Sequence, residues 1–183
     1  MVATKKMQNK IAAAAKDVLL APVYLYQGHK IKRDTVRLPE PNGERHGQVQ
    51  LNNSPITSKG KSNNILNLMV VGDSAAAGVG SQTQQEALVG HLIPILTEQA
   101  AIQSAFDTLN WSLQATTGYT SFDILRRLYV LPAPSQPIDV MVLSVGVNDT
   151  TSKVSAAQWQ QQIEDTIDIA QRKFGVRELV FLS

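Results

Sequence analysis

Hydrophobic positions change their spacing along the chain, and from residue 65 onward the changes predict strands and helices in succession. Apolar or alternating runs of strand length lie at 65–71, 109–113, 138–145 and 177–182. Apolar residues recur at helical spacing in the intervening segments 86–103, 121–131 and 155–174. This alternation builds a parallel sheet with helices on both faces. We therefore predict an α/β fold: a flavodoxin-like, doubly wound parallel sheet in three α/β/α layers, in which the first strand lies between the second and third.

The first third of the chain has a different pattern. Residues 5–21 place apolar side chains on one face and lysines largely on the other, which predicts a basic amphipathic helix that ends at Pro22. Residues 27–63 are polar and rich in Gly and Pro, and we expect them to form an irregular or partly extended arm. The predicted division is therefore a helix and arm over 1–63 and an α/β domain over 64–183.

Charge is distributed unevenly between these two parts. Residues 1–60 hold ten Lys and Arg against four Asp and Glu, although the whole chain has a net charge of only +2. A basic segment of this kind can pack on its own acidic domain, or it can attach peripherally to anionic lipid. The basic residues lack interleaved aromatic residues, so we expect no nucleic-acid partner. Lys16 and Asp17 interrupt the apolar part of the amino terminus, which argues against a secretory signal and favours a cytoplasmic location.

The most informative motif follows the first strand, where VVGDSAAAGVG (70–80) forms a turn of small residues around Ser74. No Gly-Lys-Ser/Thr follows, so the turn is not a Walker phosphate loop. Gly78-Val79-Gly80 lacks the third glycine of a dinucleotide-binding fingerprint. Alanine also replaces the second glycine of an α/β-hydrolase nucleophile elbow. The turn therefore either presents Ser74 as a nucleophile or uses it as a helix N-cap.

Two further strand ends carry related features. The second predicted strand is followed by ATTGYTS with a single glycine, Gly118, and the third by Gly146-Val147-Asn148-Asp149. In the predicted strand order these ends lie on either side of Ser74. A hydroxyl, a glycine amide and a carboxamide at one point suit the oxyanion of a tetrahedral intermediate. Considered alone, Asn148 and Gly118 can equally be ordinary turn residues.

Taken in order, GDS, the lone glycine and GxND resemble the SGNH hydrolases, which are also called GDSL-type esterases or lipases. The resemblance covers residues 65–183, and part of the 20–47 arm is similar to an extension of some members. It implies a serine hydrolase acting on carboxylic esters through an acyl-serine intermediate, with Ser74 as the nucleophile. The amides of Ser74 and Gly118 and the side chain of Asn148 would form the oxyanion hole. No cofactor or metal is implied, and the residues show no metal-ligand spacing.

The sequence departs from the family in two places. Ala75 stands where the family name has leucine, and the Asp-x-x-His block that supplies the general base is absent. The histidines present are His29 and His46 in the arm and His91 in a predicted helix, none in the expected context. We therefore expect a chain interrupted before that block, with impaired activity. The alternative is a non-catalytic ligand-binding module on the same fold. Ester specificity and oligomeric state are left open.

Overall fold

The computed structural model describes residues 20–28, 30, 33–34, 36, 38–51 and 64–182. The chain divides into two compact units, Met1–Leu38 and Pro39–Ser183. In the first unit, residues 20–28 are helical, so the prediction that Pro22 ends the helix is wrong. A proline ring disturbs the turn that precedes it and leaves the following residues free to be helical. The predicted helix 5–21 lies almost entirely outside the described residues.

The second unit is built on a five-stranded sheet with the order β1-β3-β2-β4-β5. Its strands are β1 (His46–Gln50), β2 (Ile65–Gly72), β3 (Thr108–Ala115), β4 (Val140–Ser144) and β5 (Glu178–Leu182). Neighbouring strands from β2 to β5 are parallel, and β2 lies between β3 and β4 as predicted. The sheet is nevertheless mixed, because β1 pairs antiparallel with β3 at the edge. The sequence HGQVQ has one apolar residue, so its pairing depends on the open edge of β3 rather than on burial.

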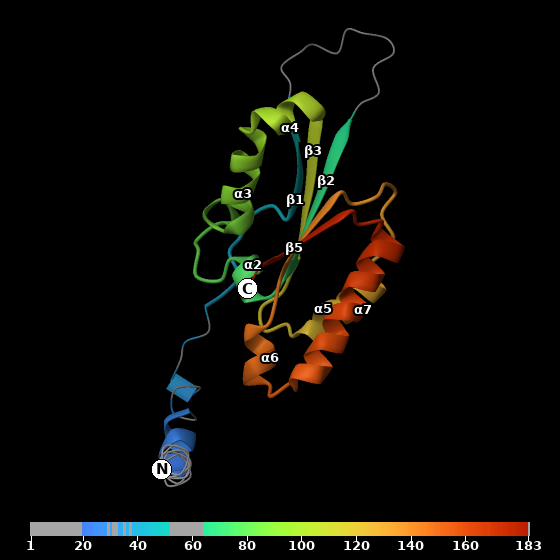
Figure 1. Cartoon of the computed structure of the whole chain (residues 1–183). Coiled ribbons are helices and arrows are strands. Elements are labelled where there is room, and N and C mark those ends of the chain that lie inside the picture. Colours follow the sequence, from blue (N-terminus) through green and yellow to red (C-terminus); the bar gives the residue numbers. More distant parts are fainter. Residues whose placement is uncertain are drawn as a thin grey trace, which may run out of the picture. The chain divides into compact units, whose positions relative to one another are not determined.

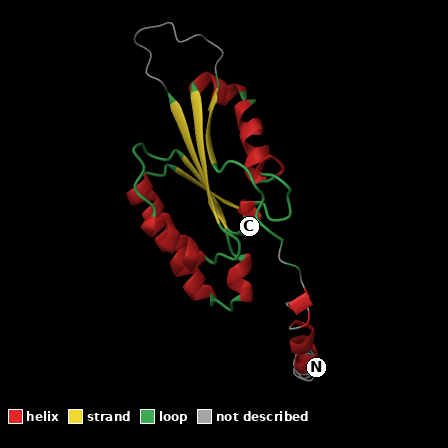
Figure 2. Ribbon diagram, turned by 180° about the vertical axis from the view of Figure 1, so that it is seen from behind, coloured by secondary structure: helices red, strands yellow, loops and turns green. Residues whose placement is uncertain are grey.

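Helices cover both faces of this sheet, which confirms the predicted three layers (Figures 1 and 2). The helices are α2 (Ser74–Ala77), α3 (Leu88–Thr97), α4 (Ala100–Ala105), α5 (Ser121–Val130), α6 (Val147–Thr151) and α7 (Ala156–Phe174), with a 3-10 turn at Gln84–Glu86. One core joins α5 and α7 to the sheet around Leu128, Met141 and Phe174. The other core lies under α2 and α3 around Val70 and Val89. The predicted helix over 86–103 is divided at Glu98–Gln99 into α3 and α4.

Helix α7 has a capping residue at each end. Ser155 accepts a hydrogen bond from the backbone N–H of Gln158, and the Gln158 side chain returns the bond in a capping box. Gly175 ends the helix with φ of +64°, in the left-handed conformation that glycine adopts without strain.

The two faces are covered to different extents. On the α3 side, a groove of about 610 Å³ extends over β4 and β5, lined by apolar side chains that include Leu68, Val142 and Val180. Val180 and Leu182 of β5 are 46% and 38% exposed on the surface. Among the residues that the structure describes, no helix combines the length and apolarity needed to cross a membrane.

Candidate active site

The turn after β2 is fixed by a close approach to β4. A Cβ on Gly72 would lie 2.5 Å from the carbonyl oxygen of Ser144, so glycine is required there. The backbone N–H of Asp73 donates to the same oxygen at 3.2 Å. The Asp73 side chain caps α2 by accepting from the N–H of Ala75 at 3.0 Å. Ser74 is therefore the first helical residue and not the N-cap, so the capping alternative is excluded. Its half-buried hydroxyl is not needed to cap α2.

The connection from β3 to α5 carries Gly118 with φ of +85°. A side chain there would meet open space, so the backbone conformation, and not crowding, favours glycine. In the described part of the chain, the Gly118 N–H donates no hydrogen bond to the protein. Ser74 N–H also has no intrahelical acceptor, because it opens α2. Two backbone donors are thus available near the strand ends.

Asn148 joins the two turns. It is the second residue of α6, which follows its N-cap Gly146, whose φ is +135°. Its side-chain Nδ2 donates to Asp73 Oδ2 at 3.3 Å and to the carbonyl oxygen of Tyr119 at 2.9 Å. Asp73 precedes Ser74 and Tyr119 follows Gly118. The structure therefore brings the three predicted residues to one end of the sheet, with Asn148 bonded to a neighbour of each of the other two.

The same contacts occupy both hydrogens of the Asn148 amide. To donate to a substrate oxyanion, Asn148 would have to exchange one of these partners. The bond to Asp73 is the longer one. Burial raises the pKa of Asp73, and the nearby negative charge of Asp149 acts in the same direction.

Asp149, the residue after Asn148, is buried and forms hydrogen bonds that hold the fold together. It is 2% exposed and accepts from the backbone N–H of Ser121 at 3.1 Å and from its hydroxyl at 2.6 Å. The side chain of Gln162 on α7 lies against the same hydroxyl at 2.5 Å. Asp149 therefore anchors the start of α5 to α6.

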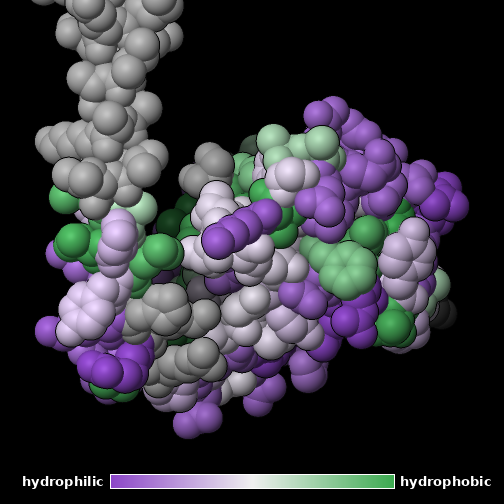
Figure 3. Space-filling model, turned by 90° about the horizontal axis from the view of Figure 1, so that it is seen from below, coloured by the Kyte–Doolittle hydropathy of each residue, from purple (hydrophilic) through white to green (hydrophobic). Residues whose placement is uncertain are grey.

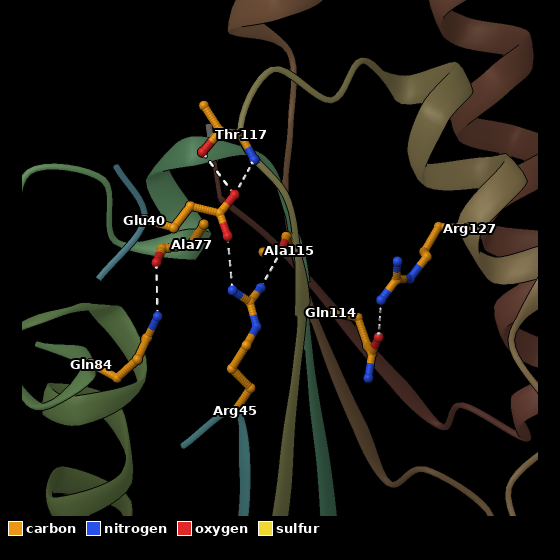
Figure 4. A network of polar contacts seen from close by, with 8 residues as sticks. All are labelled: Glu40, Arg45, Ala77, Gln84, Gln114, Ala115, Thr117 and Arg127. Atoms are coloured by element: carbon orange, nitrogen blue, oxygen red, sulfur yellow. Dashed lines mark hydrogen bonds and ion pairs between the residues drawn. The ribbon is translucent and has the colours of Figure 1, made fainter. Parts of the chain in front are cut away.

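Sequence reasoning missed a second anchor of the β3–α5 connection. Glu40 accepts from the backbone N–H of Thr117 at 2.6 Å and from its hydroxyl at 2.8 Å, and Arg45 pairs with Glu40 at 2.9 Å (Figure 4). Burial acts to raise the pKa of Glu40, but the bonds from Thr117 and Arg45 outweigh it and hold that pKa below its usual value. Glu40 and Arg45 are an oppositely charged pair that the sequence could have indicated. Their partner Thr117, however, lies 77 residues after Glu40 in the sequence.

Among the described residues, no histidine contacts Ser74. His46 is exposed in β1 opposite Ser112, and His91 is exposed in α3. In the same part of the chain, no three His, Cys, Asp or Glu residues are grouped so that they could hold a metal ion. As far as the described residues go, the site therefore contains a hydroxyl and hydrogen-bond donors without an imidazole that accepts the proton of Ser74.

Figure 3 shows this end of the molecule from below, with pale, weakly polar surface between hydrophilic side chains. A hollow of about 550 Å³ lies beside α6. Its lining is mainly apolar and includes Val145, Val147, Trp159 and Phe181. An apolar group of a ligand fits such a lining.

The comparisons with known proteins identify the family of this chain. Residues 70–180 match the model of the GDSL-like Lipase/Acylhydrolase family, and the chain belongs to that family. The matched range contains Ser74, Gly118 and Asn148. No curated protein matches the sequence.

One solved structure supports the same fold. The crystal structure of TesA superposes with a TM-score of 0.52 at 29% identity, over 62% of this chain and 58% of TesA. A G-D-S-L lipolytic protein of Veillonella parvula DSM 2008 gives 0.48 at 16% identity, over 62% of this chain and 57% of that protein. Axe2, an acetylxylan esterase from Geobacillus stearothermophilus, gives 0.48 at 13% over 66% and 59%. The chain thus spans less than two thirds of the length of each of these proteins.

Proposed function

We propose that the chain is a serine ester hydrolase in which Ser74 is the nucleophile and the strand-end donors form the oxyanion hole. The observation that carries the proposal is the bridge from Asn148 to the neighbours of both Ser74 and Gly118. In the proposed reaction, Ser74 Oγ attacks an ester carbonyl carbon and its proton passes to a base. The tetrahedral oxyanion accepts from the N–H groups of Ser74 and Gly118 and from Asn148. Its collapse expels the alcohol and leaves an acyl-serine, which water hydrolyses.

The proton acceptor limits this reaction. The sequence contains no Asp-x-x-His block, and neither described histidine contacts Ser74. Without a positioned base, the serine must lose its proton to water or buffer, so we expect turnover to be slow. Loss of a triad member lowers turnover by orders of magnitude while leaving residual catalysis by oxyanion stabilisation and binding.

The test is covalent labelling of Ser74 by a fluorophosphonate, combined with hydrolysis of p-nitrophenyl acetate. We expect slow labelling that Ser74→Ala abolishes and that Ser104→Ala on α4 leaves unchanged. Added imidazole should accelerate ester hydrolysis by the wild type, because it supplies the missing base, and should have no effect on the Ser74→Ala variant beyond its effect in buffer alone. Absence of labelling with and without imidazole would overturn the proposal.

A second function has one observation in its favour. Both amide hydrogens of Asn148 are engaged within the protein, which suits a module that binds esters without transforming them. Such a module would bind a non-hydrolysable ester analogue, and would remain unlabelled at Ser74 even with imidazole. The labelling experiment therefore separates the two functions.

A further inference from the structure

One short segment contacts both the β3–α5 connection, which carries Gly118, and the end of α2, the helix that begins with Ser74. This segment, Pro39–Arg45, is called the strap here, and it precedes β1. At one end, Glu40 holds the backbone N–H and the hydroxyl of Thr117, the residue before Gly118. Arg45 pairs with Glu40 and also donates to the carbonyl oxygen of Ala115, at the end of β3 (Figure 4). The connection is thus held at two successive points.

The middle of the strap reaches the helix that carries Ser74. The carbonyl oxygen of Asn42 accepts from the backbone N–H of Gln84 at 2.9 Å. The buried side chain of Gln84 in turn donates to the carbonyl oxygen of Ala77, the last residue of α2, at 3.0 Å. Pro41 lies against Gly78, where an added Cβ would be 3.2 Å from its Cγ. The strap therefore reaches α2 directly through Pro41 and indirectly through Gln84.

Gly118 makes few contacts of its own and lies in a turn that the N–H of Tyr119 closes on the carbonyl oxygen of Thr116 at 3.3 Å. It is exposed, no atom lies within 4 Å of the place where its Cβ would be, and its N–H has no acceptor in the described part of the chain. The direction of that N–H therefore depends on the residues on either side. Thr117 is fixed by Glu40, and Tyr119 by the hydrogen bond that its carbonyl oxygen accepts from Asn148 Nδ2.

We propose that the strap is a positioning element of the active site, in which Glu40 orients the Gly118 N–H toward the oxyanion while Pro41 and Gln84 hold α2. This inference rests on the proposed function and assigns a role to residues outside the three strand-end motifs. Glu40 acts through Thr117 and does not touch the substrate. A preorganised donor stabilises charge in the transition state without a reorganisation cost, so its misalignment should lower the rate of acylation rather than the affinity for the ester.

The first test is independent of catalysis. In the ¹⁵N-labelled full chain, Glu40→Gln should move the amide resonances of Thr117 and Gly118 and speed hydrogen exchange at Thr117 about 10-fold, as expected when a hydrogen bond to a charged acceptor is weakened. Asp168→Asn removes a carboxylate from another arginine pair, on the exposed face of α7, and should leave both resonances in place. Unmoved resonances in Glu40→Gln would overturn the positioning role.

The second test measures the reaction with a fluorophosphonate. Glu40→Gln should lower the maximal inactivation rate about 10-fold while the half-saturating concentration stays the same; a merely destabilised protein would not show this split. Thr117→Val should show a smaller loss, and Thr117→Ser, which keeps the hydroxyl, should restore the wild-type rate. This pair also serves if Glu40→Gln fails to fold. An equal rate in all variants overturns the proposal, whereas failure of the wild type to react overturns the proposed function and leaves exchange at Thr117 to decide the role of the strap.

Discussion

Two carboxylates hold the connection between β3 and α5, and they use the same pattern of hydrogen bonds in different surroundings. Glu40 accepts the N–H and hydroxyl of Thr117, and Asp149 accepts the N–H and hydroxyl of Ser121. The Glu40 side chain is 29% exposed and paired with Arg45. Asp149 is 2% exposed, and in the described part of the chain no Lys or Arg forms an ion pair with it.

This difference in burial implies different roles for the two carboxylates. A buried acceptor that is removed leaves its donors without water to replace it, so the bonds of Asp149 are costly to lose. Near the surface, water can take the place of Glu40, and the free energy lost is small. The geometry of the connection can still change there. We therefore expect Asp149 to matter mainly for folding, and Glu40 mainly for the direction of the Gly118 amide.

The largest expected effect comes from Asp149→Ala. The substitution leaves the buried N–H of Ser121 without its acceptor and its hydroxyl with Gln162 alone, and we expect the unfolding free energy to fall by about 3 kcal/mol. Urea unfolding followed by circular dichroism measures this loss. Asp168→Asn, in an exposed pair on α7, is the matched control and should leave the unfolding free energy nearly unchanged. Equal losses in the two variants would contradict the division proposed for the two carboxylates.

A pair of hydroxyl deletions sharpens the comparison. Ser121→Ala removes a buried bond to Asp149 and should cost about 2 kcal/mol, whereas Thr117→Val removes a surface bond to Glu40 and should cost less than about 1 kcal/mol. Both variants keep the backbone N–H that binds the carboxylate. Urea midpoints at a constant slope provide the measurement. A larger loss in Thr117→Val would show that the strap is part of the folding core.

The strands and the main helices followed from the sequence because local patterns encode them. The run ILNLMVV is apolar except for Asn67 and forms β2, which is largely buried, and Ser155 and Gly175 set the ends of α7 through capping. Position 74 was recognisable because a strand, a glycine and a serine adjoin in the sequence. That Asp73 and not Ser74 would cap α2 could not be read, since both residue types are good N-caps.

The long-range contacts of the site were not encoded in any local pattern. Glu40 and Thr117 meet only because β1 adds to the edge of β3. The sequence of β1 has too few apolar residues to predict a strand. Asp149 belongs to the motif that contains Asn148, but its role depends on Ser121, which lies 28 residues earlier. Hydrogen bonds between distant polar residues are fixed by the tertiary fold, so sequence spacing alone does not predict them.

The smallest expected effect is the contribution of Glu40 to the pH dependence of the unfolding free energy. Because the folded protein holds the pKa of Glu40 below its usual 4.5, this residue stabilises the fold at neutral pH, and the contribution disappears as pH falls through the lowered value. Asp73 acts in the opposite sense: burial raises its pKa above 3.8, so protonation at low pH relieves a cost. The wild-type curve mixes the two effects, and a difference between variants separates them.

The stability difference between wild type and Glu40→Gln should therefore be constant near neutral pH and shrink below about pH 4.5, where the wild-type carboxylate also loses its charge. Urea midpoints collected from pH 7 to pH 3 would show this convergence, and the amide resonance of Thr117 should shift over the same range. A difference that persists unchanged to pH 3 would mean that the charge of Glu40 adds nothing to its bond with Thr117. The strap would then position Gly118 by shape alone, and the contrast with Asp149 would rest on burial without any contribution from the ion pair.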